Sequence, residues 1–372
     1  MRVGVGCVPF LIILAIASAA PAQTVAESRA ACTNKGEAYS LQQRIAGCTA
    51  AIAIKGVSAG NLATSHLNRG VAYGNDRQTA LAIADFDQAI RLNPNFGDAY
   101  FSRAFAYSRL NRHDRAIPDY DQAIRITPTN AEAYFYRGNA YVTVSPDRAI
   151  ANYSEAIRLK PDYADALKLR AIVYREQNQL ALAIADFGRA IILRPRSADL
   201  FHHRGNAYAD RSDDTRAIAD FSEAIRLDPT FLGAFNNRAI AYRRQKKLTE
   251  AVADYDQAIR LGPKLAILYF NRANALADHL QSDRALADFD KAIQLDPKFA
   301  VGYLNRGNLY RKMRQHVRAI GDYNQVIRLT PNDARAFYGR GLARAALGQR
   351  REAAADIASA TKIDPVIASQ YH

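Results

Sequence analysis

The segment AIADFDQAIRLNP, residues 82–94, decides the fold because the chain repeats it along most of its length. Residues 251–263 read AVADYDQAIRLGP, which keeps the apolar positions and the closing proline. The prolines recur every 34 residues, with one interval of 33. A fixed period of this length is typical of a tandem repeat array. The prolines are Pro94, Pro128, Pro161, Pro195, Pro229, Pro263, Pro297, Pro331 and Pro365.

Each phrase has the apolar spacing of a helix. Ile83, Phe86 and Ala89 fall three residues apart, with Ile90 beside them, which predicts an amphipathic helix that ends before the proline. A second helical segment precedes each phrase, such as residues 100–107, joined to it through a polar turn such as residues 111–114. The predicted unit is therefore a helix hairpin.

The pattern resembles the tetratricopeptide-repeat (TPR) family, in a secreted bacterial form. Its units carry a bulky aromatic, a small residue four positions later, a Tyr three beyond, and then Ala, an aromatic, Ala and Pro. The resemblance covers nine repeats over residues 63–366, before a tail of residues 367–372. It implies an all-α, right-handed superhelical solenoid of stacked helix hairpins that binds other proteins or peptides. One matching repeat has Phe201, Gly205, Tyr208, Ala217, Phe221, Ala224 and Pro229.

The repeats place a small residue at their eighth position, counted from residues 63, 97, 131, 164, 198, 232, 266, 300 and 334. Gly or Ala there lets paired helices approach closely, and aromatic side chains fill the space around it. These small residues are Gly70, Ala104, Gly138, Ala171, Gly205, Ala239, Ala273, Gly307 and Gly341.

Residues 1–22 have the features of a cleavable signal peptide. Arg2 precedes an apolar run over residues 8–17, and small residues around Ala20 and Ala22 fit a signal peptidase site. The run is too short to span a bilayer comfortably. We therefore expect a periplasmic or secreted protein that is not transmembrane, with an uncleaved membrane anchor as the alternative.

Residues 23–62 resemble a degenerate N-terminal repeat. Residues 45–54 match the second helix of a unit, with Cys48 at the aromatic position and Cys32 on the partner helix. Two cysteines bound for an oxidising compartment favour one disulfide. The alternative is a pair of small buried thiols.

An arginine precedes the small residue in all nine repeats, and an aspartate follows sixteen positions later in eight of them. Asn152 is the exception. Because an unpaired buried Arg costs several kcal/mol, we expect these residues to pair within or between repeats. The arginines are Arg69, Arg103, Arg137, Arg170, Arg204, Arg238, Arg272, Arg306 and Arg340. The aspartates are Asp85, Asp119, Asp186, Asp220, Asp254, Asp288, Asp322 and Asp356.

The formal charge of +14 raises the question of a nucleic-acid partner. Many of the bases recur at the ends of second helices, where a cation complements the helix dipole. No basic stretch interleaved with stacking aromatics occurs, so we expect no nucleic-acid partner. A general attraction to acidic surfaces or polymers is expected instead.

The family resemblance implies a concave groove lined by the first helices, mainly through positions 2, 5, 6, 9 and 13. Asparagines recur at positions 6 and 9, and Asn can pair with a peptide backbone of any sequence. The row resembles the asparagine ladder of the O-linked N-acetylglucosamine transferase superhelix. His202 and Phe270 stand where a carboxylate clamp would have Lys, so we do not expect recognition of a terminal carboxylate there. The asparagines are Asn68, Asn139, Asn206, Asn237, Asn271, Asn274, Asn305 and Asn308.

The predicted groove is graded along its length. Phe101, Phe105, Phe135 and Tyr136 make the early part aromatic, whereas Arg243, Arg244, Arg311 and Lys312 make the later part basic. A ligand with an apolar segment and an acidic one would suit it. The alternative is that the asparagines are simply the usual family residues at these positions.

Nothing in the sequence has the pattern of an active site. His202 and His203 point about 100° apart on a helix and cannot easily share a metal, so we expect solvated groove histidines. No nucleophile–base arrangement, phosphate-binding glycine loop or calcium loop occurs. We expect a scaffold without cofactor or metal that is not an enzyme. A binder of acidic polysaccharide or cell-envelope polymer is the alternative.

Overall fold

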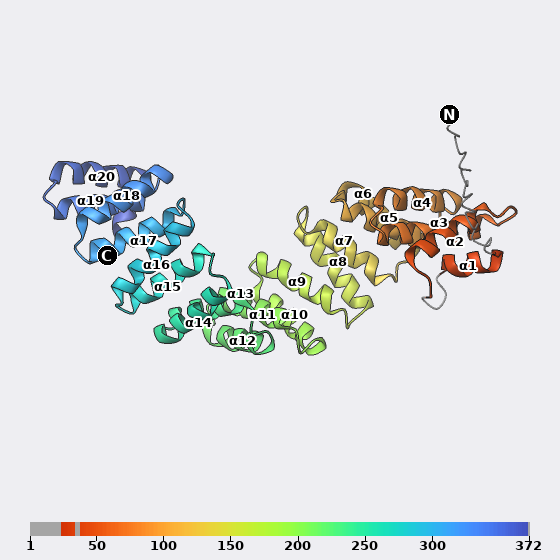
Figure 1. The fold of residues 1–372 in the computed structure, drawn as a ribbon, viewed down its shortest axis with the longest axis horizontal. Coiled ribbons are helices and arrows are strands. Elements are labelled where there is room, and N and C mark those ends of the chain that lie inside the picture. Colours follow the sequence, from red (N-terminus) through yellow and green to blue (C-terminus); the bar gives the residue numbers. More distant parts are fainter. Residues whose placement is uncertain (1–23, 34–37, 371–372) are drawn as a thin grey trace, which may run out of the picture. The chain divides into compact units, whose positions relative to one another are not determined.

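A computed structural model describes residues 24–33 and 38–370 of the chain. Within these residues the protein forms 20 α-helices and one short 3-10 helix, with no strand (Figure 1). The predicted all-α fold is confirmed. The predicted signal peptide, residues 1–22, lies outside the described residues. None of the described helices is both long and apolar enough to cross a membrane.

The chain divides into two compact units, with the boundary between Lys160 and Pro161. Unit 1 contains α1 (Val25–Thr33), α2 (Leu41–Ala53), α3 (Ala59–Asn75), α4 (Thr79–Leu92), α5 (Gly97–Arg109), α6 (His113–Ile126), α7 (Ala131–Tyr141) and α8 (Pro146–Leu159). Unit 2 contains α9 (Ala164–Glu176), α10 (Leu180–Leu193), α11 (Ala198–Asp210), α12 (Asp214–Leu227), α13 (Leu232–Arg244), α14 (Leu248–Leu261), α15 (Ala266–Asp278), α16 (Ser282–Leu295), α17 (Ala300–Lys312), α18 (His316–Leu329), α19 (Ala334–Ala346), α20 (Arg350–Ile363) and η1 (Ile367–Gln370).

Consecutive helices pack as hairpins, and the hairpins stack on one another within each unit. In unit 2, α15 packs on α16, α16 packs on α17, and α15 also contacts α17 directly. In unit 1, α3, α4 and α5 repeat this arrangement. The first helices of neighbouring repeats therefore lie next to each other.

The small residues at position 8 are required by close helix contacts. A Cβ atom added at Gly70 would lie 2.6 Å from the Phe86 ring, and one added at Gly205 would lie 2.7 Å from the Phe221 ring. Real Cβ atoms do not approach other atoms this closely. The aromatic side chain at position 24 therefore fills the space that the small residue leaves.

The turn inside most hairpins places position 15 in the left-handed region. Leu280 has φ 60° and Asn111 has φ 55°, whereas the last repeat uses Gly348 with φ 76°. Residues other than Gly and Asn are strained in this conformation. The other residues of this set are Arg77, Asn178, Ser212, Lys246 and Arg314.

The predicted arginine–aspartate pairs are confirmed. The Arg272 Nε and Nη2 atoms each donate to Asp288 in the same repeat at 2.7 Å. Its Nη1 atom donates to Asp256 in the preceding repeat at 2.6 Å. One guanidinium therefore joins two helices of its own repeat and one of the repeat before it. Asn152, the predicted exception, accepts a hydrogen bond from Arg137 Nε at 2.7 Å.

Position 25, which supplies that third contact, varies along the chain. Asp87 and Asp290 accept from Arg103 and Arg306, whereas Ser222 accepts from Arg238. Gly188 occupies this position before Arg204 and has no side chain to offer. The inter-repeat half of the ladder therefore differs in strength from joint to joint.

Helices α1 and α2 form a pair that packs on α3. The Sγ atoms of Cys32 and Cys48 lie 2.14 Å apart, and their Cα atoms lie 4.4 Å apart. Both residues are buried, together with Ala51. The geometry supports the predicted disulfide.

Part of the C-terminal tail packs on the last hairpin. Ile367 in η1 is 1% exposed and packs against Ala334 and Ala360. This single turn covers apolar surface of the last hairpin.

Candidate functional site

A pocket of about 200 Å³ in unit 2 brings together four of the residues predicted to bind a ligand. They are Arg243, Asn274, Asn305 and Asn308. The pocket lies between α15 and α17, with Arg243 contributed by α13 and Phe289 by α16. Its complete lining is Arg243, Asn274, Ala277, Asp278, Phe289, Asn305, Asn308, Leu309 and Lys312.

Hydrogen bonds fix the three asparagine side chains of this pocket. Asn305 Nδ2 donates to Asn274 Oδ1 at 2.8 Å, and Asn274 Nδ2 donates to the Phe270 carbonyl at 2.9 Å. The Tyr323 hydroxyl donates to Asn308 Oδ1 at 2.8 Å. The amides are therefore oriented before any ligand arrives.

Two polar atoms of the pocket remain available. Asn305 Oδ1 and Asn308 Nδ2 have no hydrogen-bond partner among the described residues, so one acceptor and one donor are left open. Because residues three apart on a helix share a face, the two amides are neighbours on α17. This arrangement can pair with the N–H and C=O groups of an extended peptide.

The positive charge of the later groove is partly neutralised. Arg243 donates to Asp278 at 2.6 Å, and Arg244 lies 2.8 Å from Asp214. Lys312 lines the pocket and has no ion-pair partner among the described residues. Arg311, predicted as a groove base, does not line this pocket. Lys312 is therefore the cation of this pocket that has no ion pair among the described residues.

Asn206, Asn237 and Asn271 belong to a chain of hydrogen bonds that runs through three repeats. Asn237 Nδ2 donates to Asn206 at 2.8 Å, Asn236 donates to Asn237 at 3.0 Å, and Asn271 donates to Asn236 at 3.0 Å. The sequence analysis missed Asn236, which stands at position 5. These asparagine side chains therefore form hydrogen bonds with one another. In unit 1, Asn139 accepts from the Tyr153 hydroxyl at 2.7 Å.

His202 is half-buried, which corrects the expectation of solvated histidines. Its ring lies 4.7 Å from that of Phe231 and 5.8 Å from that of Phe221. Burial lowers the pKa of His202 to about 4. Asn237 Nδ2 lies 3.2 Å from Nε2, which places the imidazole proton on Nδ1.

His203 faces a different set of partners. Its Nε2 atom lies 3.3 Å from Asp199, which also contacts Lys168 at 3.1 Å. The hydrogen bond from His203, followed by that from Lys168, holds the pKa of Asp199 well below its usual range. Within the described residues, no group of three or more His, Cys, Asp and Glu could hold a metal ion.

Unit 1 contains an apolar pocket of about 250 Å³ between α3 and α5. Phe101 and Phe105 line it, and Tyr136 packs against both rings at 5.8 Å and 5.0 Å without lining it. Phe105 is 37% exposed. Of the four aromatic residues predicted for the early groove, Phe101 and Phe105 therefore line this pocket.

The two pockets occupy the same place in the repeat. Each uses positions 9, 12, 13 and 24 of one repeat and positions 6, 9, 10 and 13 of the next. Position 9 is Val71 and Phe105 in unit 1, but Asn274 and Asn308 in unit 2. One packing geometry therefore produces an apolar pocket and a polar one.

Family comparisons agree with the repeat pattern. Models described as "TPR repeat" match residues 108–144, 171–212, 205–246 and 240–279. Models described as "Tetratricopeptide repeat" match residues 63–96, 86–117 and 289–321. The chain belongs to the tetratricopeptide-repeat family, whose members are generally non-catalytic scaffolds that bind other proteins or peptides. None of the curated proteins matches the chain significantly.

The chain is similar to several solved structures. A tetratricopeptide repeat protein from Parabacteroides merdae is 20% identical, covers 66% of this chain and 98% of its own, and has a TM-score of 0.52. YrrB, described as a TPR protein with an unusual peptide-binding site, is 26% identical over 48% of this chain and 92% of its own, with a TM-score of 0.44. Yeast Tom70 is 15% identical and covers 91% of both chains, with a TM-score of 0.43.

Proposed function

We propose that this protein is a non-enzymatic scaffold that binds polypeptide segments, and that the pocket between α15 and α17 is one of its binding sites. The pocket contacts the main chain of an extended segment through Asn305 and Asn308. Lys312 adds a preference for an acidic residue nearby. The partner is therefore a flexible or extended protein region rather than a small metabolite.

The open donor and acceptor on α17 carry this proposal. Each is held in place by a bond on the other side of its amide, from Tyr323 to Asn308 and from Asn305 to Asn274. Preorganised groups lose little entropy on binding, which favours recognition of a backbone whose sequence varies. The Asp278 carboxylate is already paired with Arg243 and does not repel an incoming carbonyl.

The proposal is tested by photo-crosslinking from position 312 inside the cell. A polypeptide should crosslink there but not from the exposed position Gln257 on α14. Replacing Asn305 and Asn308 by Ala removes two hydrogen bonds and should weaken binding of the captured segment about tenfold or more. Asn95→Ala, in an exposed turn, is the matched control. Unchanged affinity in the double variant would exclude the pocket.

An acidic polysaccharide or cell-envelope polymer fits the pocket less well. Such a ligand needs several unpaired cations, whereas Arg243 and Arg244 are already paired with aspartates. Binding to an anionic polymer that disappears in moderate salt, with no polypeptide crosslinked from position 312, would favour the polymer.

We also propose that the protein acts in the periplasm or outside the cell. The disulfide geometry at Cys32 and Cys48 supports this, because such bonds persist in oxidising compartments. Cell fractionation and N-terminal sequencing test it. A mature protein beginning at Gln23 in the periplasmic or culture fraction is expected, and a cytosolic protein that retains Met1 would contradict it.

A further inference from the structure

The turns that join α17 to α18 and α19 to α20 form one surface at the C-terminal end of unit 2 (Figure 1). Leu347 of the second turn lines a pocket of about 430 Å³ together with residues 314–318 of the first. The helix α19 packs on both α17 and α18, so the two turns lie side by side. We call residues 313–318 and 347–352 the basic turn surface.

Four arginines of the basic turn surface are exposed and have no ion-pair partner among the described residues. Arg318 donates to the neutral side chain of Gln315 at 2.9 Å, and its guanidinium lies 5.7 Å from the centre of the Tyr310 ring. Neither contact neutralises its charge. Glu352 is the one acidic residue in the two sequence segments of this surface. The four arginines are Arg314, Arg318, Arg350 and Arg351.

Other arginines of unit 2 are neutralised by carboxylates. Arg344 precedes the second turn and lies 2.8 Å from Asp356. Arg243 donates to Asp278 at 2.6 Å in the α15–α17 pocket. The basic turn surface therefore has an excess of positive charge that its surroundings do not balance.

Apolar side chains project from the same surface. Val317 is 73% exposed and Leu347 is 42% exposed, and both line the pocket between the two turns. Leu280, in the turn of the preceding repeat, is 89% exposed. Bases beside projecting aliphatic side chains are typical of proteins that bind at a membrane surface. The cations contact anionic headgroups, and the aliphatic groups enter the boundary of the acyl chains.

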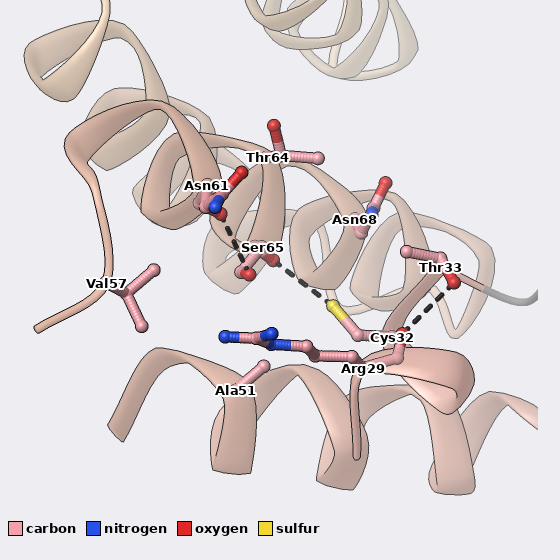
Figure 2. Close-up of a pocket in the computed structure, with 9 residues that line it drawn as sticks. All are labelled: Arg29, Cys32, Thr33, Ala51, Val57, Asn61, Thr64, Ser65 and Asn68. Carbon is pink, nitrogen blue, oxygen red and sulfur yellow. Dashed lines mark hydrogen bonds between the residues drawn. The ribbon is translucent and has the colours of Figure 1, made fainter. Parts of the chain in front are cut away.

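An exposed arginine alone does not produce this combination. Figure 2 shows Arg29 beside the pocket between α1, α2 and α3, where it is the one charged residue of the lining. No large apolar side chain of that lining is exposed. Arg29 therefore offers a control for charge without projecting apolar groups.

We propose that the basic turn surface binds an anionic lipid bilayer, with its four arginines contacting lipid phosphates and Val317 and Leu347 entering the interface. A planar guanidinium matches the geometry of phosphate oxygens. A soluble polyanion would gain nothing from the projecting aliphatic side chains, which favours the bilayer. This inference does not depend on the polypeptide-binding function proposed for the α15–α17 pocket.

Co-sedimentation with lipid vesicles tests the proposal, using the protein as isolated from cells. One set of vesicles contains equal amounts of phosphatidylcholine and phosphatidylglycerol, and the other contains phosphatidylcholine alone. The neutral vesicles measure the background, including any contribution from the apolar residues 8–17 if these are retained. We expect binding to the anionic vesicles above this background, and we expect that binding to weaken as salt rises.

Replacing the four arginines of the basic turn surface by Gln should lower the affinity for anionic vesicles by about a hundredfold or more. Each base near a membrane surface contributes about fivefold. The control replaces four scattered arginines by Gln, which changes the net charge equally and should cost less than about threefold. These control arginines are exposed and have no ion-pair partner among the described residues. They are Arg29, Arg91, Arg125 and Arg260.

The apolar contribution has its own pair of variants. Val317→Ser should lower the affinity for anionic vesicles about fivefold, because less apolar surface leaves water. Val144→Ser, at a turn residue of unit 1 that is 67% exposed, should leave it unchanged. Asn305→Ala/Asn308→Ala should also leave it unchanged, which separates this surface from the α15–α17 site. Circular dichroism checks that all variants are folded.

Several outcomes would overturn the proposal. They are equal binding to neutral and anionic vesicles, no binding to either, equal losses in the two fourfold arginine variants, and an unchanged affinity in Val317→Ser. Retention on heparin or capture of an acidic protein, with no vesicle binding, would assign the surface to a different partner and would also overturn it.

Discussion

The Nη1 atom of Arg204 lies 3.8 Å from the place where a side chain at Gly188 would begin. Elsewhere a side chain at this position accepts from the arginine of the next repeat, as Asp256 does from Arg272 at 2.6 Å. Arg204 keeps its two bonds to Asp220, each 2.8 Å long. The contact between these two repeats therefore lacks a link that other joints of the chain have.

Gly188→Asp should supply that link. The variant also removes a glycine from the interior of α10, so we expect a gain of about 1 kcal/mol in the free energy of unfolding. Urea unfolding at low and high salt measures it. Gly188→Ala is the control, because its gain comes from helix propensity alone and should not depend on salt. A salt-independent gain in the Asp variant would argue against the ion pair.

The two aspartates that hold Arg272 should differ in importance. Asp288→Ala leaves the half-buried Arg272 guanidinium without its bidentate partner and should cost about 3 kcal/mol. Asp256, whose side chain is 35% exposed, should cost less than about 1 kcal/mol when replaced by Ala. Thermal unfolding of both variants gives the comparison, and equal losses would contradict the assigned roles.

Leu280 is strained by its left-handed backbone, and its side chain is 89% exposed. Leu280→Gly should therefore stabilise the protein by about 0.5 kcal/mol, since the strain relieved exceeds the effect of the conformational entropy that glycine adds to the unfolded chain. The reverse change, Gly348→Ala, should destabilise it by a similar amount although nothing crowds that position. Differential scanning calorimetry of both variants checks the signs.

Stability should fall in mild acid because of His202. Its folded-state pKa of about 4 lies below the ordinary value near 6.5, so the unfolded chain takes up a proton that the folded chain refuses. Between pH 7.5 and pH 5 this should remove about 2 kcal/mol from the free energy of unfolding of unit 2. His202→Phe introduces the residue that two other repeats have at this position, Phe101 and Phe270. This variant should lose this part of the pH dependence. An unchanged pH profile would mean that His202 is not the group responsible.

The disulfide should be detectable as a linked peptide containing Cys32 and Cys48 in non-reducing mass spectrometry. Reduction should destabilise the α1–α2 pair by about 3 kcal/mol in the chain-entropy model. A Cys32→Ala/Cys48→Ala variant should show no response to reductant. Two unlinked thiols in the mature protein would refute the pairing.

Local repetition made much of this fold predictable. The hairpins and the pairing of Arg272 with Asp288 follow from residues at fixed offsets within one repeat. The hydrogen bonds between repeats were harder to foresee, because they depend on how the repeats stack. Asn236 at position 5 meets Asn237 beside it and Asn271 in the next repeat, a contact that spacing along the sequence does not reveal.

The candidate site was likewise predictable within a repeat but not between repeats. The asparagines of the pocket could be found by comparing repeats, but the pairing of Arg243 with Asp278 across a joint could not.

The two pockets use the same positions of the repeat, so the positions that hold the stack can be told apart from those that set pocket chemistry. Residues that hold the stack, such as Arg272 and Asp288, stand at positions 7 and 23. Those that set pocket chemistry, such as Asn274 and Phe105, stand at position 9. Selection can therefore act on ligand preference and on folding almost independently. Descendants of such a chain could acquire new partners through a few substitutions while purifying selection preserves the scaffold.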